Sequence, residues 1–315
     1  KLLICVMKGL TLMLYDCIII GGGIGGLQAA IQLGRYKHHI AIVDNGGGRS
    51  TLCKEYHNIL GWPDGVNGEF FREAGKKQAL SYDVKMIEDT ASSITKNEDG
   101  TFSVHLKIGN SLQGKKLLLA TGMTERIPDL DGIYPCLGRS IYICPDCDGY
   151  EISNKKTIVI GSGNKGAQLS LLLTYWTKDI IYVNHDLDDI DKELKAKLKS
   201  KHIPLYQEVV SELHYKEEGY LSGITLSNGY KIEANHAFLA MKGTKVNSNI
   251  AKEIGIERLE NLHVNVNHRT KETNVANVWA VGDLVNHSQL LSVAMGDGAQ
   301  AAIWIHKSLQ KELAT

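Results

Sequence analysis

The folded part of the chain begins with a run of apolar residues at positions 14–20, a pattern typical of a buried strand. A glycine-rich turn follows at positions 21–26, and an apolar pattern of helical spacing begins at Leu27. A second apolar run, at positions 40–43, ends at Asp44. This order of strand, turn, helix and strand, with an acidic residue at the tip of the second strand, predicts a nucleotide-binding βαβ unit.

The three spaced glycines of this turn each meet a requirement of such a unit. Gly21, Gly23 and Gly26 allow a tight turn, a close approach of the backbone to a pyrophosphate, and close packing of the helix against the strand. The amino end of the helix then faces the phosphates. Asp44 can accept hydrogen bonds from an adenosine ribose. A glycine turn that serves packing alone is the other interpretation.

The same pattern occurs a second time further along the chain. An apolar run at positions 156–160 leads into a turn with Gly161, Gly163 and Gly166, and a helical pattern then extends to about Trp176. The next apolar run lies at positions 180–183. The chain therefore contains two predicted nucleotide-binding units, although the second glycine turn is also open to the packing interpretation.

Two shorter motifs frame the second unit. The apolar run at 117–119 ends at Ala120, Thr121 and Gly122, and the apolar run at 278–281 ends at Gly282 and Asp283. A helical stretch follows at 291–305. This order is explained if the chain leaves a first domain, builds a second, and returns to complete the first.

We therefore predict an α/β protein with two Rossmann-like domains, each doubly wound and three-layered, of which the first is discontinuous. The predicted boundaries place an amino-terminal extension at residues 1–13. The first domain is expected at 14–126 and 245–315, and the second at 127–244.

Composition narrows the classes of partner. The 315 residues carry 35 basic and 35 acidic side chains, so the formal net charge is zero and no field steers the protein toward nucleic acid or acidic membranes. No run approaches the roughly 20 apolar residues that span a bilayer. We expect a soluble, cytoplasmic protein that binds neither nucleic acid nor membrane.

Cysteine spacing supplies the candidate chemistry. Four of the six cysteines have no partner at a diagnostic spacing, namely Cys5, Cys17, Cys53 and Cys136. Cys144 and Cys147 form a C-x-x-C pair. Half a zinc site or two structural cysteines are the alternatives to a redox pair. Zinc needs two further ligands, and the sequence contains no second C-x-x-C and no H-x-x-x-H, so we predict a redox pair and no metal.

Five features occur in a set order along the chain: the first glycine turn, Ala120-Thr121-Gly122, Cys144-Pro145-Asp146-Cys147-Asp148-Gly149, the second glycine turn, and Gly282-Asp283 followed by Gln289. With these features the chain resembles the low-molecular-weight thioredoxin reductases, flavoproteins of the pyridine nucleotide-disulfide oxidoreductase class. The resemblance covers almost everything from Leu14 onward. In that family the C-x-x-C-D-G lies immediately before the fingerprint strand of the nucleotide domain, as it does here.

The resemblance implies a role for each motif. The first domain would bind FAD, through the residues Gly21, Gly23, Gly26, Asp44, Thr121, Gly122, Gly282, Asp283 and Gln289. Asp283 would reach the ribitol chain, and Gln289 would lie near the flavin ring. In the second domain Cys147 would lie against the flavin and Cys144 would exchange with an external disulfide. Asp148 would handle protons, which is useful because a thiolate is the species that attacks a disulfide.

The nicotinamide site departs from the family pattern. Members that use NADPH carry His-Arg-Arg after the strand that follows the second turn, whereas this chain has Asn184, His185 and Asp186. The arginines that pair with a 2′-phosphate are missing, and Asp186 would repel that group. NAD(P)H binding through Gly161, Gly163 and Gly166 is therefore doubtful. Either Asn184 or Asp186 accepts a ribose 2′-hydroxyl and selects NADH, or the second unit is a scaffold and electrons arrive otherwise.

The resemblance implies a FAD-dependent disulfide oxidoreductase that passes electrons between flavin and the Cys144–Cys147 pair and on to thioredoxin or a similar disulfide. A homodimer is expected by the same resemblance. A dithiol oxidase acting on a small dithiol, or a ferredoxin-dependent reductase that does not use NADPH, is the alternative enzyme. A flavin-binding redox sensor without turnover is the alternative from another class.

Overall fold

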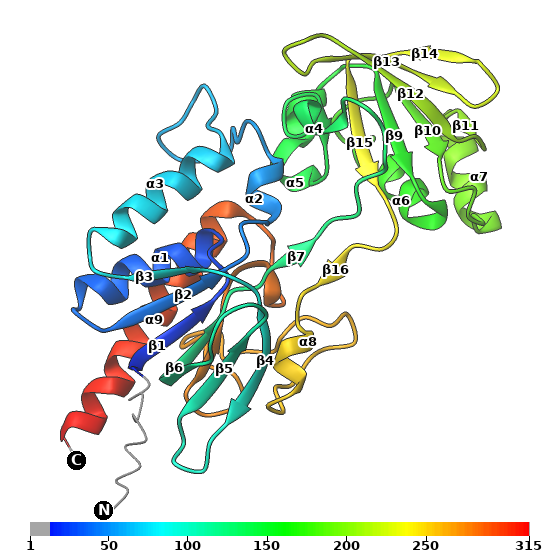
Figure 1. The fold of residues 1–315 in the computed structure, drawn as a ribbon. Coiled ribbons are helices and arrows are strands. Elements are labelled where there is room, and N and C mark those ends of the chain that lie inside the picture. Colours follow the sequence, from blue (N-terminus) through cyan, green and yellow to red (C-terminus); the bar gives the residue numbers. More distant parts are fainter. Residues whose placement is uncertain (1–12, 315) are drawn as a thin grey trace, which may run out of the picture. The chain divides into compact units, whose positions relative to one another are not determined.

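The chain passes back and forth between two units in the computed structural model, which describes residues 13–314 (Figure 1). Unit 1 contains the described residues up to Gly47, together with Ala74–Gly122 and the residues from Asn247 onward. Unit 2 contains Gly48–Glu73 and Met123–Val246. The predicted extension at 1–13 lies outside the described residues except for Met13.

One segment differs between the pattern-based boundaries and the observed units. Gly48–Glu73 falls within the predicted first domain, yet it groups with unit 2. The backbone N–H of Lys54 donates to the carbonyl oxygen of Leu137 at 3.1 Å, and a Cβ on Gly138 would lie 2.6 Å from the sulfur of Cys53. These contacts join the segment to unit 2. The boundaries of the two nucleotide-binding domains stay a prediction.

Unit 1 is built on a seven-stranded sheet in the order β3-β2-β1-β6-β5-β4, and β17 pairs with β6 beyond the end of β5. The strands β1, β2, β3, β6 and β17 run parallel, whereas β4 and β5 are antiparallel to their neighbours. The strands are β1 (Leu14–Ile20), β2 (Ile40–Asp44), β3 (Lys85–Glu88), β4 (Ala91–Lys96), β5 (Phe102–Leu106), β6 (Leu112–Leu119) and β17 (Val278–Ala280).

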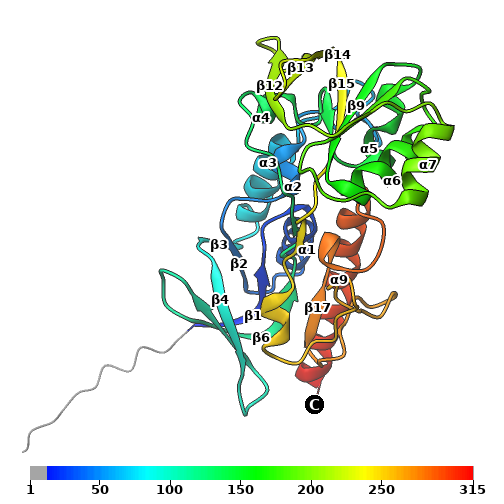
Figure 2. The same ribbon diagram turned by 90° about the vertical axis from the view of Figure 1, so that its right-hand side faces the viewer.

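The helices of unit 1 cover the apolar strands. The helices and 3-10 turn are α1 (Ile24–Arg35), the later part of α3 (Gly68–Leu80), α8 (Asn249–Lys252), η2 (Gly282–Leu284) and α9 (Leu291–Ala314). Every residue of β2 is buried, as its continuous apolar run predicts. Figure 2 shows α9 beside α1, and a core of α1, α9, β1 and β2 side chains lies between these elements.

Unit 2 contains a five-stranded parallel sheet in the order β11-β10-β9-β15-β8, a three-stranded antiparallel sheet β12-β13-β14, and the pair β16-β7 (Figure 1). The strands are β7 (Met123–Thr124), β8 (Ile141–Tyr142), β9 (Thr157–Gly161), β10 (Ile180–Asn184), β11 (Leu205–Tyr206), β12 (Val210–Tyr215), β13 (Leu221–Leu226), β14 (Lys231–Glu233), β15 (His236–Ala240) and β16 (Lys245–Val246). The helices are α2 (Arg49–Leu52), α4 (Ile133–Cys136), α5 (Pro145–Asp148), α6 (Gly163–Leu173) and α7 (Lys192–Ser200), with the 3-10 turn η1 (Gly149–Ile152).

Each unit therefore contains one βαβ element with a glycine turn. In unit 1 it is β1-α1-β2, and in unit 2 it is β9-α6-β10, with the two strands parallel in both cases. The predicted α/β class with two Rossmann-like domains is confirmed. No helix among residues 13–314 is long and apolar enough to cross a membrane.

Candidate functional site

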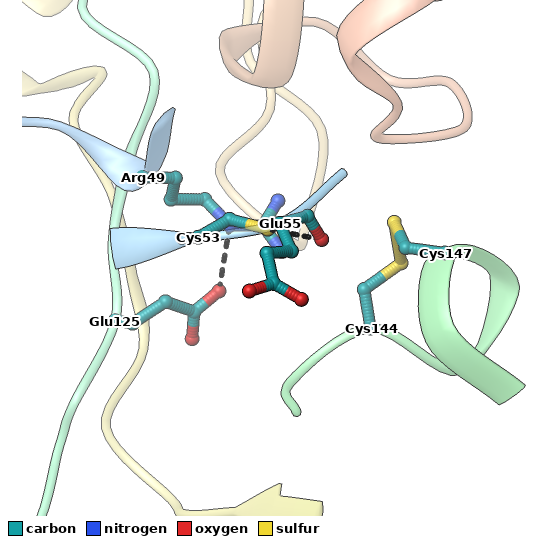
Figure 3. The surroundings of a disulfide bond; sticks show 6 residues. All are labelled: Arg49, Cys53, Glu55, Glu125, Cys144 and Cys147. Carbon is teal, nitrogen blue, oxygen red and sulfur yellow. Dashed lines mark hydrogen bonds and ion pairs between the residues drawn. A yellow bond between two sulfur atoms is a disulfide. The ribbon is translucent and has the colours of Figure 1, made fainter. Parts of the chain in front are cut away.

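A disulfide joins Cys144 and Cys147 at the beginning of the short helix α5 (Figure 3). Cys144 is the extended residue before the helix, and Pro145 follows at a position where no backbone N–H is needed. The backbone N–H of Cys147 donates to the carbonyl oxygen of Cys144 at 3.2 Å. This tight turn holds the two Cα atoms 5.3 Å apart, a separation that a disulfide spans readily.

The carboxyl group of Asp148 lies directly after the disulfide and is buried, with 6% of the residue exposed. Burial raises the pKa of Asp148 to about 7, the negative charge of Glu151 acts in the same direction, and Arg49 opposes both. Near neutral pH this carboxyl group can therefore both give and take a proton. Such a group is suited to acid-base work on a neighbouring sulfur.

The segment Gly48–Glu73 supplies further polar side chains near the disulfide within unit 2 (Figure 3). Arg49 Nε lies 3.0 Å from Glu125 Oε1, and Arg139 Nε donates to Glu55 Oε1 at 2.6 Å. Burial raises the pKa of the Cys53 thiol to about 12, and the charge of Asp148 adds to that rise. Cys53 therefore stays a thiol and is not a nucleophile at neutral pH.

Three residues of this environment were missed by sequence analysis: Arg49, Glu55 and Glu151. None of them belongs to a motif. Of the three, only the position of Glu151 could have been inferred from the sequence. It stands three positions after Asp148, so in a helical turn the two carboxylates would be neighbours.

The first glycine turn lies between β1 and α1. Gly21 has a φ of +107°, and a Cβ there would lie 2.2 Å from the carbonyl oxygen of Ala120. A Cβ on Gly26 would lie 2.0 Å from the carbonyl oxygen of Gly21, so only glycine lets α1 pack this closely. Among the described residues, no atom lies within 4 Å of a Cβ built on Gly23. The turn thus presents backbone to open space at the amino end of α1.

Asp44 lies beside this turn at the end of β2. Its Oδ1 atom accepts a hydrogen bond from the backbone N–H of Gly22 at 3.0 Å, and the residue is 9% exposed. Thr121 and Gly122 lie at the point where the chain leaves unit 1. The Thr121 hydroxyl donates to the carbonyl oxygen of Asn247 at 2.7 Å, which ties the outgoing chain to the returning one.

Gly282 and Asp283 form the 3-10 turn η2 after β17. The backbone N–H of Gly282 donates to Oδ2 of Asp297 at 3.1 Å. Asp297 also contacts His287 and, at 2.7 Å, Lys271 Nζ. Burial alone would raise the pKa of Asp297, but the hydrogen bonds from His287 and Lys271 outweigh burial and lower it. This buried carboxylate therefore fixes the loop that carries Asp283.

Gln289 lies on the same loop and contacts a buried histidine. Its Nε2 atom is 3.3 Å from Nε2 of His263, a residue that is 6% exposed. Burial lowers the pKa of His263, so the ring is neutral near pH 7. Its Nδ1 atom is buried and has no hydrogen-bond partner among the described residues. A buried polar atom of this kind marks a place where a bound group would supply the partner.

These features of unit 1 fit a dinucleotide. Open space lies against the backbone at Gly23, the amino end of α1 offers N–H groups to phosphates, and Asp44 stands where a ribose would lie. His263, whose Nδ1 atom has no partner among the described residues, contacts through Nε2 the side chain of Gln289, the residue expected beside the flavin ring.

The second glycine turn lies between β9 and α6. A Cβ on Gly161 would lie 2.8 Å from Gly166, and Gly163 has a φ of +46°. Asn184 is fully buried, and its Oδ1 atom accepts from the backbone N–H of Gly163 at 2.7 Å. The Asn184 amide is therefore engaged within unit 2. Asp186 pairs with Arg126, with 3.0 Å between Nη2 and Oδ1.

The described residues contain neither a candidate metal site nor a second disulfide. Among the described residues, no group of three or more His, Cys, Asp and Glu side chains could hold a metal ion. The described cysteines outside the pair are the free thiols Cys17, Cys53 and Cys136, and Cys5 lies outside the described residues.

Residues 15–298 match the family described as pyridine nucleotide-disulphide oxidoreductase. The chain belongs to this family. This pyridine nucleotide-disulphide oxidoreductase is 27% identical over 332 residues to the probable thioredoxin reductase of Arthroderma benhamiae, with 95% of this chain and 81% of that protein covered. It is also 27% identical over 309 residues to thioredoxin reductase aclD of Aspergillus oryzae, with 94% and 96% covered.

A solved structure shares the fold of this oxidoreductase. The thioredoxin reductase of Streptococcus pyogenes superimposes with a TM-score of 0.82 at 21% identity, over 95% of this chain and 99% of that one. The predicted resemblance to thioredoxin reductases is confirmed, and the chain is a thioredoxin reductase-like enzyme.

Proposed function

We propose that this enzyme is a FAD-dependent disulfide oxidoreductase that passes electrons between flavin and the Cys144–Cys147 pair and on to the disulfide of a thioredoxin-like protein. The observation that carries the proposal is the Cys144–Cys147 disulfide, which the buried residue Asp148 follows directly in the chain. A disulfide placed next to a group that exchanges protons near pH 7 is suited to repeated reduction and oxidation.

Unit 1 would hold the FAD. The backbone at Gly23 and the amino end of α1 would receive the pyrophosphate, and Asp44 the adenosine ribose. Asp283 would bind the ribitol chain, while Gln289 and His263 would bind the edge of the ring system. When bound, the flavin supplies the two-electron chemistry that no side chain can provide.

The chain's own residues would carry out the exchange with the acceptor. Two electrons and two protons convert the Cys144–Cys147 disulfide into two thiols. As a thiolate, Cys144 would attack the acceptor's disulfide, forming a mixed disulfide and releasing one acceptor sulfur. Cys147 would then attack Cys144, which restores the enzyme's disulfide and releases the second acceptor sulfur. Asp148 would take the proton from the attacking sulfur and return one to the departing sulfur.

The substitution Cys147→Ser tests this proposal independently of the electron donor. The flavin of the purified enzyme is reduced with dithionite without oxygen, oxidised thioredoxin is added, and flavin reoxidation is followed by absorbance. We expect Cys147→Ser to keep its flavin and to lose reoxidation by thioredoxin. The control is Cys136→Ala, a free thiol of the same unit, which should keep the reaction. Full reoxidation in Cys147→Ser would overturn the proposal.

The homodimer and the cytoplasmic location stay predictions. The same experiment separates the proposed enzyme from a redox sensor without turnover, because a sensor would show no reoxidation with any disulfide.

A further inference from the structure

The two glycine turns can be compared position by position, because each lies between the first strand and the helix of a βαβ element. Gly23 in unit 1 corresponds to Gly163 in unit 2. Around Gly23 no described atom lies within 4 Å of the Cβ position. At Gly163 the Cβ position is only 2.7 Å from the carbonyl oxygen of Asp189 and 2.9 Å from Cβ of Asp188. The side-chain position is therefore open at Gly23, whereas residues 188 and 189 lie against Gly163.

Asp188 and Asp189 belong to the loop of residues 186–191, which follows β10. We call this loop the acidic strap. Its sequence is Asp-Leu-Asp-Asp-Ile-Asp. The strap is fixed at its far end by a reciprocal pair, since Asn164 Nδ2 donates to Asp191 Oδ2 at 2.7 Å and the backbone N–H of Asp191 donates to Asn164 Oδ1 at 2.8 Å. Ile190 is buried in the core of unit 2. The strap is therefore packed onto the turn.

The middle and near end of the strap are held as well. Asn184 Nδ2 donates to the carbonyl oxygen of Asp188 at 2.6 Å. The hydroxyl of Ser162, a residue of the turn itself, donates to Asp186, and both terminal nitrogens of Arg126 bind that same carboxylate. A guanidinium group that could pair with a phosphate is thus bound to Asp186 instead.

The charge of the strap opposes a phosphate. Its four carboxylates lie on Asp186, Asp188, Asp189 and Asp191. The cations facing them are Arg126, which is paired with Asp186, and Lys242, whose Nζ lies 3.7 Å from Asp188 Oδ2. Lys165 is turned away, because its Nζ donates to the carbonyl oxygen of Met241 at 2.8 Å. A 2′-phosphate brought beside β10 would meet an excess of negative charge.

We propose that the acidic strap determines the nucleotide specificity of this enzyme and excludes NADPH from unit 2. The strap acts in two ways: residues 188 and 189 pack against Gly163 of the glycine turn, and the Asp186 carboxylate takes the place of the 2′-phosphate on Arg126. The inference rests on the proposed function, since it concerns the donor of the same enzyme. Its test does not depend on electron transfer.

Two substitutions separate the two actions of the strap in the flavin-loaded enzyme. Asp186→Arg removes the repelling charge and should increase the affinity for NADP⁺ at least tenfold while changing that for NAD⁺ little. Asn164→Ala releases the far end of the strap and should increase the affinity for both nucleotides to a similar extent. The control Asp179→Arg makes the same charge change at an exposed residue at the opposite end of β10, and it should alter neither affinity.

Isothermal titration calorimetry with NADP⁺ and NAD⁺ measures these affinities, and circular dichroism with flavin absorbance verifies folding. The unchanged enzyme is expected to bind NADP⁺ with a Kd above the millimolar range and to keep its flavin oxidised when NADPH is added without oxygen. Micromolar binding of NADP⁺ by the unchanged enzyme would overturn the proposal. So would folded variants that gain no affinity. Reoxidation of dithionite-reduced flavin by thioredoxin tests the proposed function separately, so the two failures are distinguishable.

Discussion

Asp148 differs from an ordinary surface aspartate in the pH at which it loses its proton. Asp148 follows Cys147 in the chain and is buried, and its pKa is raised to about 7 by burial first and by Glu151 second. Below that pH the group is a proton donor, and above it the group is a base. The proposed exchange needs both, because one sulfur loses a proton while another gains one.

The substitution Asp148→Asn should therefore change the pH dependence of exchange. Protonated Asp148 donates to the departing sulfur, so its contribution is present below its pKa and lost as pH rises through about 7. We expect the unchanged enzyme to exceed Asp148→Asn by roughly 10²-fold at pH 6 and by much less at pH 9. Stopped-flow reoxidation of dithionite-reduced flavin by thioredoxin measures both rates.

The control for this measurement is Asp146→Asn, an exposed carboxylate in the same helical turn, which should leave the profile unchanged. A rate ratio between the unchanged enzyme and Asp148→Asn that stays constant from pH 6 to pH 9 would contradict the acid role.

At the residue scale, sequence patterns identified side chains whose function depends on neighbours in the chain. Cys144, Cys147 and Asp148 lie within one turn, and the glycines at 21, 23 and 26 act through their own backbone. Arg49 and Glu55 could not be predicted, because Arg49 acts on Asp148 and Glu55 pairs with Arg139 only through the packing of Gly48–Glu73 in unit 2.

At the scale of elements, the packing of α1 against α9 depends on one glycine. A Cβ on Gly298 would lie 2.2 Å from the carbonyl oxygen of Gly25, a backbone atom that cannot rotate away. We expect Gly298→Ala to lower the free energy of unfolding by about 1–3 kcal/mol, a typical effect of overpacking. Urea unfolding followed by circular dichroism measures the change.

Gly296 provides a matched control in the same helix. No described atom lies within 4 Å of its Cβ position, and the residue is exposed. Gly296→Ala should therefore raise the free energy of unfolding by about 0.5–1 kcal/mol, since alanine favours the helix. Equal effects of the two substitutions would show that helix propensity, not contact with Gly25, decides the outcome.

At this scale, the spacing of glycines predicts where a turn forms but not which residues pack against it. Both turns were predicted from the same spacing, and both form between a parallel strand and a helix. The sequence showed that Asp186 replaces an arginine, but not that Asp188 and Asp189 cover Gly163. That contact depends on how the strap folds back after β10, which no local periodicity encodes.

At the scale of the whole molecule, the two units have separate hydrophobic cores. All the residues expected to bind FAD lie in unit 1, so FAD should stabilise that unit alone. We expect calorimetry of the flavin-free protein to show two unfolding transitions, of which FAD raises only one. A concentration of 100 times Kd adds about 2.7 kcal/mol to the stability of the binding unit. A single transition that shifts as a whole would contradict this expectation.

The order of segments in unit 1 has a consequence for synthesis. The strand β17 pairs with residues 117–119 of β6, yet β17 is translated only after the whole of unit 2. At roughly 5–20 residues per second, a ribosome needs on the order of 10 seconds to pass from β6 to β17. During that interval the nascent chain exposes an apolar sheet edge at residues 117–119, which is where a chaperone would have most to protect.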